Sequence, residues 1–317
     1  MIRNPVKLAL ASIAISMPLP ICAEPADLDP IAATAEIGQV SQLQYDSSTG
    51  ALLGVAGSKL ISIDLTAGTT ARVAQLGGEI VALALDQEAG VAGTLTADNS
   101  TISLISVGDG TTVGQIDSAV ESPGAMTVDG STGQFVGASS SIPELTLVPV
   151  DGTSVRKVQL PGPASQLVAN SRGWLFATAA DRRAVYVVDT ERGTSLGQFP
   201  VSGCEGPRSP IIDDVERRLY VACSNGLLVA IDSDTGVVLG RIPIPKNAVD
   251  MALAGTSGRI INIIVATRDG LWLASGRITA QNATRLTESL DGVSALARGP
   301  DDSVFVVHDQ TISRLRR

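Results

Sequence analysis

Aspartates that recur at turns are the first residues of this chain that could carry out chemistry. They stand in runs such as IDLTAG and VDTERG, where an apolar stretch ends and a glycine follows. Carboxylates that converge could bind calcium or act as an acid–base pair. In such turns, however, Asp accepts hydrogen bonds from backbone N–H groups two residues on, and glycine supplies a positive φ. We therefore predict a structural role for the turn aspartates, which are Asp46, Asp64, Asp86, Asp129, Asp189 and Asp232.

The single histidine, His308, lies in VVHDQTIS, at a predicted hairpin tip. One histidine cannot form a metal cluster, and a hydrolytic triad needs a nucleophile and an orienting carboxylate in defined geometry. Its neighbour Asp309 does not supply that geometry by adjacency alone. No Walker, Rossmann or G-x-S-x-G pattern occurs in a fitting context. The sequence predicts no catalytic residue, no metal ligand and no cofactor.

The N-terminal segment predicts export. Arg3 and Lys7 precede a short apolar run, Leu8–Met17, and Ile21-Cys22-Ala23 forms an acceptable cleavage site. This pattern is typical of a signal peptide, 1–23, and the run is too short to span a bilayer. A lipoprotein anchor on Cys22 is the alternative, which Ile21 disfavours because a small residue should precede that cysteine. We expect a periplasmic or secreted protein without a transmembrane segment.

The charge of the exported chain limits its partners. The full chain has a formal charge of −9, and cleavage removes two basic and no acidic residues. A strongly acidic protein is a poor general binder of DNA or anionic lipid. We expect no nucleic-acid partner.

Two cysteines, Cys204 and Cys223, remain after cleavage. An even number of cysteines in an exported chain predicts a disulfide, and two buried free thiols are the alternative. Ladder pairing would place Arg208 opposite Cys223, so the loop Gly203–Ser209 would have to fold back to bring Cys204 near.

The elements that position these residues repeat along the chain. Strand ends followed by a turn recur at Asp64, Ser106, Val148, Asp189, Asp232 and Ala274, at intervals of 42, 42, 41, 43 and 42 residues. A seventh equivalent lies near Ser313. Units of this length with four short strands and turn glycines indicate the blades of a β-propeller. The sequence therefore predicts an all-β, seven-bladed β-propeller with four-stranded antiparallel blades.

The last unit ends after its third strand, so its fourth strand must come from elsewhere. We predict that Ile31–Ile37 supplies it and closes the ring, which leaves no open edge. The predicted organisation is a signal peptide (1–23), an N-terminal linker (24–30) and one propeller domain (31–317).

The fifth unit carries the clearest local signal, RLYVACSNGLLVAIDSDTGVVLGRIPIP, from Arg218 to Pro245. Asn225-Gly226 between two alternating runs predicts a hairpin with a type I′ turn. This stretch resembles the bacterial YVTN-type, or YncE-like, repeat propellers, and other units match it in part. The resemblance implies an exported seven-bladed propeller and assigns no catalytic residue.

The run Ala230-Ile-Asp232-Ser-Asp-Thr235-Gly236 also resembles the docking motif of quinoprotein propellers. Those enzymes place Trp four residues after the Gly, whereas this chain has Gly240 there and no other unit supplies the Trp. The resemblance therefore gives no support for pyrroloquinoline quinone.

Propeller topology sorts the charged residues between two faces. Turns after the first and third strands lie on one face, which collects most of the acids. Turns between the second and third strands, together with the links between blades, lie on the other, which we call the link face. On that face the sequence predicts a ligand-binding rim formed by Arg182, Arg183, Arg208, Lys246, Asn247, Arg268 and His308. A merely solvated surface is the alternative.

These observations favour a monomeric, non-enzymatic binding or interaction scaffold. Its partner would be an anionic small molecule or an acidic segment of a protein. The alternative is a propeller enzyme of the lactonase or quinoprotein dehydrogenase type.

Overall fold

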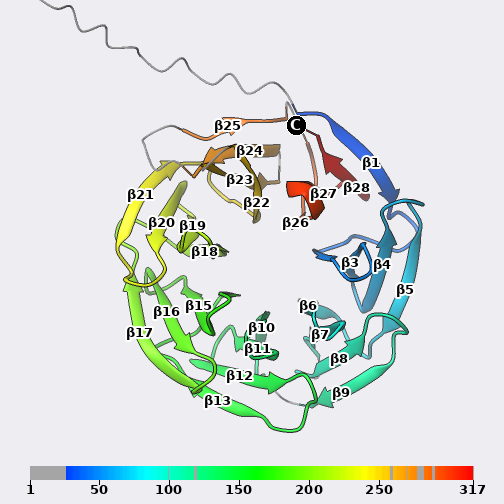
Figure 1. The fold of residues 1–317 in the computed structure, drawn as a ribbon, viewed down its shortest axis with the longest axis horizontal. Helices are drawn as coiled ribbons and strands as arrows, with labels where there is room; N and C mark the ends of the chain where they lie inside the picture. The colour runs from blue at the N-terminus through cyan, green and yellow to red at the C-terminus, as the bar shows by residue number, and fades with distance from the viewer. Residues whose placement is uncertain are drawn as a thin grey trace, which may run out of the picture.

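The ring of seven blades is the dominant feature of the structure. The computed structural model describes residues 26–316 apart from 99, 118–119, 258–259, 269, 277–281 and 288–289, so the predicted signal peptide lies outside the described residues. Seven four-stranded antiparallel sheets stand around a central axis (Figure 1). The predicted seven-bladed β-propeller is therefore confirmed.

In the first six blades the strands run in chain order from the axis outward, and in the seventh the outermost strand comes from the N-terminal part of the chain. Blade 1 comprises β2 (Gln42–Asp46), β3 (Ala51–Ala56), β4 (Lys59–Asp64) and β5 (Thr70–Gln75). Blade 2 comprises β6 (Ile80–Asp86), β7 (Val91–Thr96), β8 (Ile102–Ser106) and β9 (Thr112–Ile116). Blade 3 comprises β10 (Pro123–Asp129), β11 (Gln134–Ser139), β12 (Glu144–Pro149) and β13 (Arg156–Gln159).

Blade 4 comprises β14 (Gln166–Ala169), β15 (Trp174–Ala179), β16 (Ala184–Asp189) and β17 (Thr194–Pro200). Blade 5 comprises β18 (Pro207–Asp213), β19 (Arg218–Cys223), β20 (Leu227–Asp232) and β21 (Val238–Pro243). Blade 6 comprises β22 (Asp250–Ser257), β23 (Ile260–Thr267), β24 (Gly270–Ser275) and β25 (Thr284–Arg285). Blade 7 comprises β26 (Ala295–Arg298), β27 (Val304–His308), β28 (Thr311–Leu315) and β1 (Leu28–Ala33).

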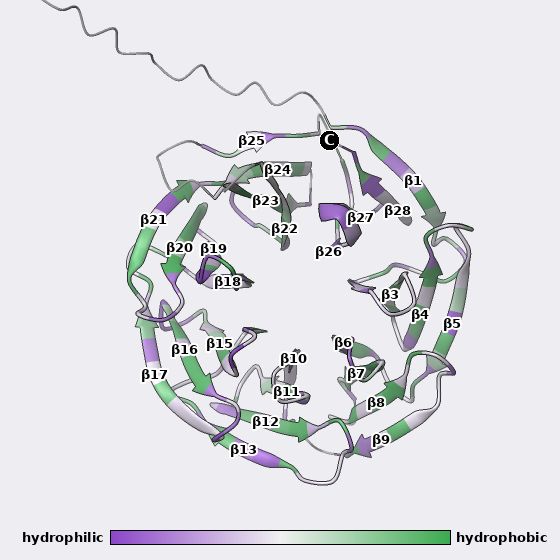
Figure 2. Ribbon diagram, in the orientation of Figure 1, coloured by the Kyte–Doolittle hydropathy of each residue, from purple (hydrophilic) through white to green (hydrophobic). Residues whose placement is uncertain are grey.

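The core lies between neighbouring blades and is built mainly of aliphatic side chains. Leu53 and Val55 of β3, for example, share one buried cluster with Leu83 and Leu85 of β6. Every residue of β3 is buried, whereas β17, an outermost strand, is almost wholly exposed. Figure 2 shows the same trend, with green middle strands and mixed colours on the outer ones. Aliphatic packing between sheets explains how a chain with 3% aromatic residues holds this fold.

β1 closes the ring, as predicted, but it lies earlier in the chain than predicted. It pairs antiparallel with β28, from Leu28 opposite Leu315 to Ala33 opposite Thr311. The predicted strand was Ile31–Ile37, yet the N–H groups of Ile37 and Gly38 both donate to the carbonyl of Thr34 and form a turn. The closing strand therefore begins inside the segment predicted as a linker.

The turn at Asn225-Gly226 differs from the predicted type I′. Gly226 has φ +85°, but Asn225 is not among the residues with positive φ, which a type I′ turn requires. The N–H of Gly226 donates to the carbonyl of Cys223, at 3.0 Å. The hairpin thus has a three-residue loop in which a turn is followed by a left-handed glycine, the second common solution for antiparallel strands.

Candidate functional site

The turn aspartates have the structural role that the sequence predicts. Asp46 accepts the N–H of Ser48 at 2.9 Å, and Asp129 accepts that of Ser131 at 2.9 Å. Hydrogen bonds from the N–H groups of Ala67 and Thr66 lower the pKa of Asp64 below its usual value. In the described part of the chain, no three His, Cys, Asp or Glu side chains are grouped so that they could hold a metal ion.

The predicted rim residues lie in the turns and links of the link face or at the strand ends beside them. Arg182 and Arg183 are in the turn between β15 and β16, and Arg268 follows β23. Lys246 and Asn247 belong to the link between β21 and β22. Arg208 lies near the start of β18, and His308 ends β27.

Three of these residues meet at one cavity. Arg208, Asn247 and Arg268 line a space of about 640 Å³ between blades 4, 5 and 6. Its lining also includes three uncharged polar side chains, which are Ser165, Gln166 and Ser209, and no carboxylate from the residues that the structure describes. Among the residues that the structure describes, neither arginine is part of an ion pair. Two unpaired guanidinium groups with amide and hydroxyl neighbours suit a carboxylate or phosphate. We call this space the basic cavity.

An irregularity in β18 places Arg208 at the basic cavity. Pairing with β19 shifts between Arg208 and Ile211, where Ser209 has φ +45° and Pro210 follows. The N–H of Ser209 donates to the side-chain oxygen of Gln166 on the neighbouring blade. Bulges of this kind redirect side chains beside functional sites. Pro207, and not Arg208, lies opposite Cys223, so the predicted register was wrong by one residue.

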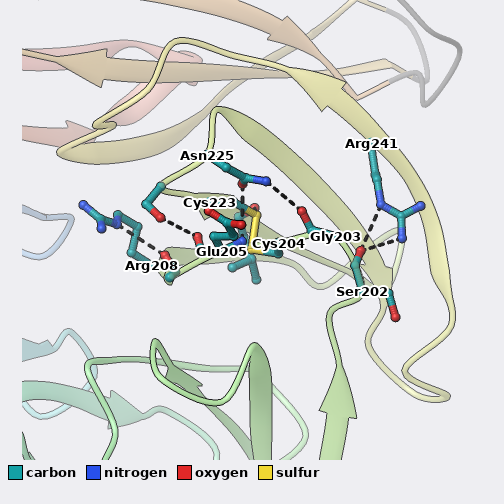
Figure 3. The surroundings of a disulfide bond; sticks show 11 residues. Ser202, Gly203, Cys204, Glu205, Arg208, Cys223, Asn225 and Arg241 are labelled. Carbon is teal, nitrogen blue, oxygen red and sulfur yellow. Dashed lines mark hydrogen bonds between the residues drawn. A yellow bond between two sulfur atoms is a disulfide. The ribbon is translucent and has the colours of Figure 1, made fainter.

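The disulfide fixes the link that leads to Arg208. Cys204 and Cys223 are bonded, with their Cα atoms 5.2 Å apart, and the prediction of this bridge is confirmed. Figure 3 shows the hairpin and the link clamped around the two sulfur atoms. The side-chain amide of Asn225 donates to the backbone carbonyl of Gly203 at 2.8 Å. The hydroxyl of Ser224 donates to the backbone carbonyl of Glu205, also at 2.8 Å. The fold-back of the loop is thus stabilised by a covalent bond and by side-chain hydrogen bonds.

The other predicted rim residues do not line this cavity. Arg183 faces Glu205 at 3.8 Å, and Arg182 faces Asp181 at 3.7 Å, all four side chains being exposed. Lys246 is exposed and is not part of the lining.

His308 lies apart in blade 7, where its Nε2 is 2.9 Å from the hydroxyl oxygen of Ser313. Burial lowers the pKa of His308, and the charge of Asp309 opposes this shift only in part. It is therefore mainly neutral at pH 7 and adds no positive charge to the rim.

A second cavity lies on the axis of the ring, and none of the predicted rim residues lines it. It has a volume of about 390 Å³ and is lined by the innermost strands. It shares Ser165, Gln166, Ser209 and Val249 with the basic cavity, so the two spaces adjoin each other. Asp250 is the one ionisable side chain among the described residues of its lining. We call this space the axial cavity.

The repeat could have directed attention to Asp250 and Gln166. Each is the first residue of the innermost strand of its blade, as Gln42 is in blade 1. Aligning the units on their first strands rather than on the third would have placed these three polar side chains around the axis.

No protein-family model matches this chain, and no curated protein matches it in sequence. Nor does any helix in the described ranges combine the length and the apolar character that crossing a bilayer requires.

Proposed function

We propose that this protein is a non-enzymatic β-propeller that binds an anionic ligand in the basic cavity of its link face. The observation that carries the proposal is the lining of that cavity, where the described residues combine Arg208 and Arg268 with no carboxylate, in a net acidic protein. Ligand sites in folds of this kind form where loops from several blades converge. The ligand is a carboxylate or phosphate, carried by a small molecule or by an acidic segment of a partner.

The proposal includes export and membership of the YVTN-type propellers. Export is supported by the sequence pattern of 1–23 and by the Cys204–Cys223 disulfide, a bond that persists in oxidising compartments. The family is supported by the repeat in the fifth unit and by the seven blades. The periplasm or the extracellular space is the proposed location.

Reversal of charge at the basic cavity tests the proposal. Succinate, citrate and inorganic phosphate are titrated calorimetrically into the wild type and into the double variant R208E/R268E. Hydrogen bonds to charged groups contribute on the order of 1.5–3 kcal/mol each, so the variant should bind at least tenfold more weakly.

The matched control is R192E. Arg192 is exposed on the opposite face and pairs with Asp189 at 3.2 Å, so its reversal should leave binding unchanged. Binding that survives R208E/R268E, or that is lost equally in R192E, contradicts the assignment. Mass spectrometry that finds a stoichiometric metal or quinone in the purified protein would instead support the enzymatic alternative.

A further inference from the structure

Asp250 faces the axial cavity, and no cationic side chain among the described residues pairs with it. Its two carboxylate oxygens each accept one backbone N–H, from Met251 and from Leu296, both at 2.8 Å. Burial raises the pKa of Asp250 to about 6, and these two hydrogen bonds oppose the shift only in part. No basic side chain contributes to that balance. The environment thus disfavours the charged form of the carboxyl group. Each oxygen also retains a lone pair that accepts neither of these two N–H groups.

The fold does not require a charge at this position. In blade 1, the side-chain oxygen of Gln42 accepts the N–H of Leu83 at 2.7 Å from the neighbouring blade. In blade 4, Gln166 accepts the N–H of Ser209 in the same way. Asp250 makes the equivalent link from blade 6 to Leu296 of blade 7. Since a neutral amide serves in two blades, linking the blades does not account for a carboxylate that is costly to bury.

The two adjoining cavities therefore present opposite charges. The basic cavity has Arg208 and Arg268, and the axial cavity has Asp250. Between them, the shared lining includes Val249, and Met126 and Pro210 provide further apolar surface in the axial cavity. A positively charged, an apolar and a negatively charged surface thus follow one another, an arrangement that suits a chain of methylene groups with a charge at each end.

We propose that the adjoining cavities open into each other and bind one zwitterionic ligand, with an ammonium group at Asp250 and a carboxylate at Arg208 and Arg268. The ligand class is an amino-carboxylate with its two charges separated by several bonds, of the kind found in ω-amino acids and short peptides. The inference rests on the proposed function for its anionic end and adds a specificity for the cationic end.

A matched ligand series tests the inference on the full mature chain. Linear ω-amino acids of four to eight carbons are titrated calorimetrically beside the carboxylates of equal length. At one length, the amino acid should bind at least tenfold more tightly than the carboxylate. Asp250→Asn, which retains an amide oxygen for the N–H of Leu296, should abolish that preference and leave carboxylate affinity unchanged. R208E/R268E should weaken both.

A second measurement examines the cationic end alone. The pKa of the Asp250 carboxyl is followed by carbon NMR while hexylamine is added, with hexanol as the uncharged control. An ammonium group at the carboxylate favours its charged form, so hexylamine should lower this pKa and hexanol should not.

The outcomes separate the two proposals. If carboxylates bind through the arginines but the amino group adds nothing at any length, or Asp250→Asn retains the preference, the zwitterion inference is overturned and the proposed function stands. A pKa of Asp250 that hexylamine does not change also overturns the inference. If no anion binds the wild type, the proposed function fails, whatever hexylamine does.

Discussion

At the scale of single residues, the aspartates of this protein show how position decides chemistry. The turn aspartates accept several local N–H groups, and in Asp64 such bonds lower the pKa. Asp250 accepts two N–H groups as well, but it faces a cavity enclosed by the inner strands, and burial raises its pKa to about 6. The same side chain is therefore hydrogen-bonded within a turn at the rim of the ring and lines a cavity at its centre.

The raised pKa of Asp250 predicts a pH dependence of stability. Its folded pKa lies above the unfolded value of 3.8, so the folded state binds the proton more tightly. This group's contribution to stability is fully present below pH 3.8 and is lost as the pH rises through about 6. Between pH 7.5 and pH 5.0, the wild type should gain about 1 kcal/mol in unfolding free energy relative to Asp250→Asn.

Urea unfolding of both proteins at the two pH values measures this difference. The lowered pKa of His308 acts in the opposite sense, because stability from a neutral histidine is lost as the pH falls below 6.5, but it is common to both proteins and cancels. Parallel pH profiles of the two proteins would contradict the assigned pKa.

The disulfide gives a second prediction at this scale. It joins residues separated by 19 positions, and closing a loop of that length stabilises a protein by about 3 kcal/mol in the chain-entropy model. The double variant C204S/C223S should lose about that much unfolding free energy. It should also bind anions more weakly, since the link to Arg208 is loosened. The bridge can be checked by alkylating the mature chain, which begins after Ala23, under denaturing and non-reducing conditions. Labelling of two thiols per chain would contradict the bridge.

At the scale of elements, the recurring turn glycines allow neighbouring blades to approach each other closely. A Cβ added to Gly68 would lie 2.4 Å from the carbonyl oxygen of Ile31, and one added to Gly110 would lie 2.1 Å from that of Val73. In both cases the turn after a third strand lies against the outermost strand of the preceding blade. The repeat of glycine at this place thus reflects a contact between blades as well as a turn conformation.

Gly110→Ala and Gly50→Ala separate those two effects. Both glycines have φ +73°, but nothing lies within 4 Å of a Cβ at Gly50. Gly50→Ala should cost about 1 kcal/mol, from the left-handed backbone alone. Gly110→Ala should cost a further 1–3 kcal/mol, roughly, because backbone atoms must move apart. Equal unfolding free energies for the two variants in urea would show that the contact between blades contributes nothing.

The elements were more predictable than their ends. Alternating runs and turn residues give each blade its strands, because burial between blades imposes the same pattern seven times. The turn at Asn225, the register of Arg208 and the start of β1 were each wrong in detail. In all three cases the observed geometry depends on contacts between residues that are remote in sequence. These contacts are the hydrogen bond from Asn225 to the link at Gly203, the hydrogen bond from the N–H of Ser209 to Gln166, and the pairing of β1 with β28.

At the scale of the whole molecule, the candidate site lies beside side chains that do not follow the repeat. The disulfide and Asp250 occur in blades 5 and 6, near the same pair of cavities. The irregularity in β18 is a shared feature, since the pairing of β6 and of β10 also shifts near the start of the strand. The repeat indicates the fold that all blades have in common. Arg208, Asn247 and Arg268 could be assigned to one face from topology, but their meeting at one cavity depends on side chains that the repeat does not specify.

Closure of the ring is the last property that belongs to the whole molecule. β1 covers the edge of β28, and contacts beyond the strand support the pairing: the N–H of Arg316 donates to the carbonyl of Asp27 at 2.9 Å, and Arg316 pairs with Asp29. Deleting 26–33 would leave the N–H and C=O groups of Thr311–Leu315 unpaired at an edge that other chains could join. The shortened protein should therefore melt at a lower temperature and self-associate in light scattering. A synthetic peptide of sequence 26–33, added in excess, should restore monomers and raise the melting temperature, whereas the same residues in scrambled order should not. A shortened protein that stays monomeric with unchanged melting would show that the seven blades hold together without this strand.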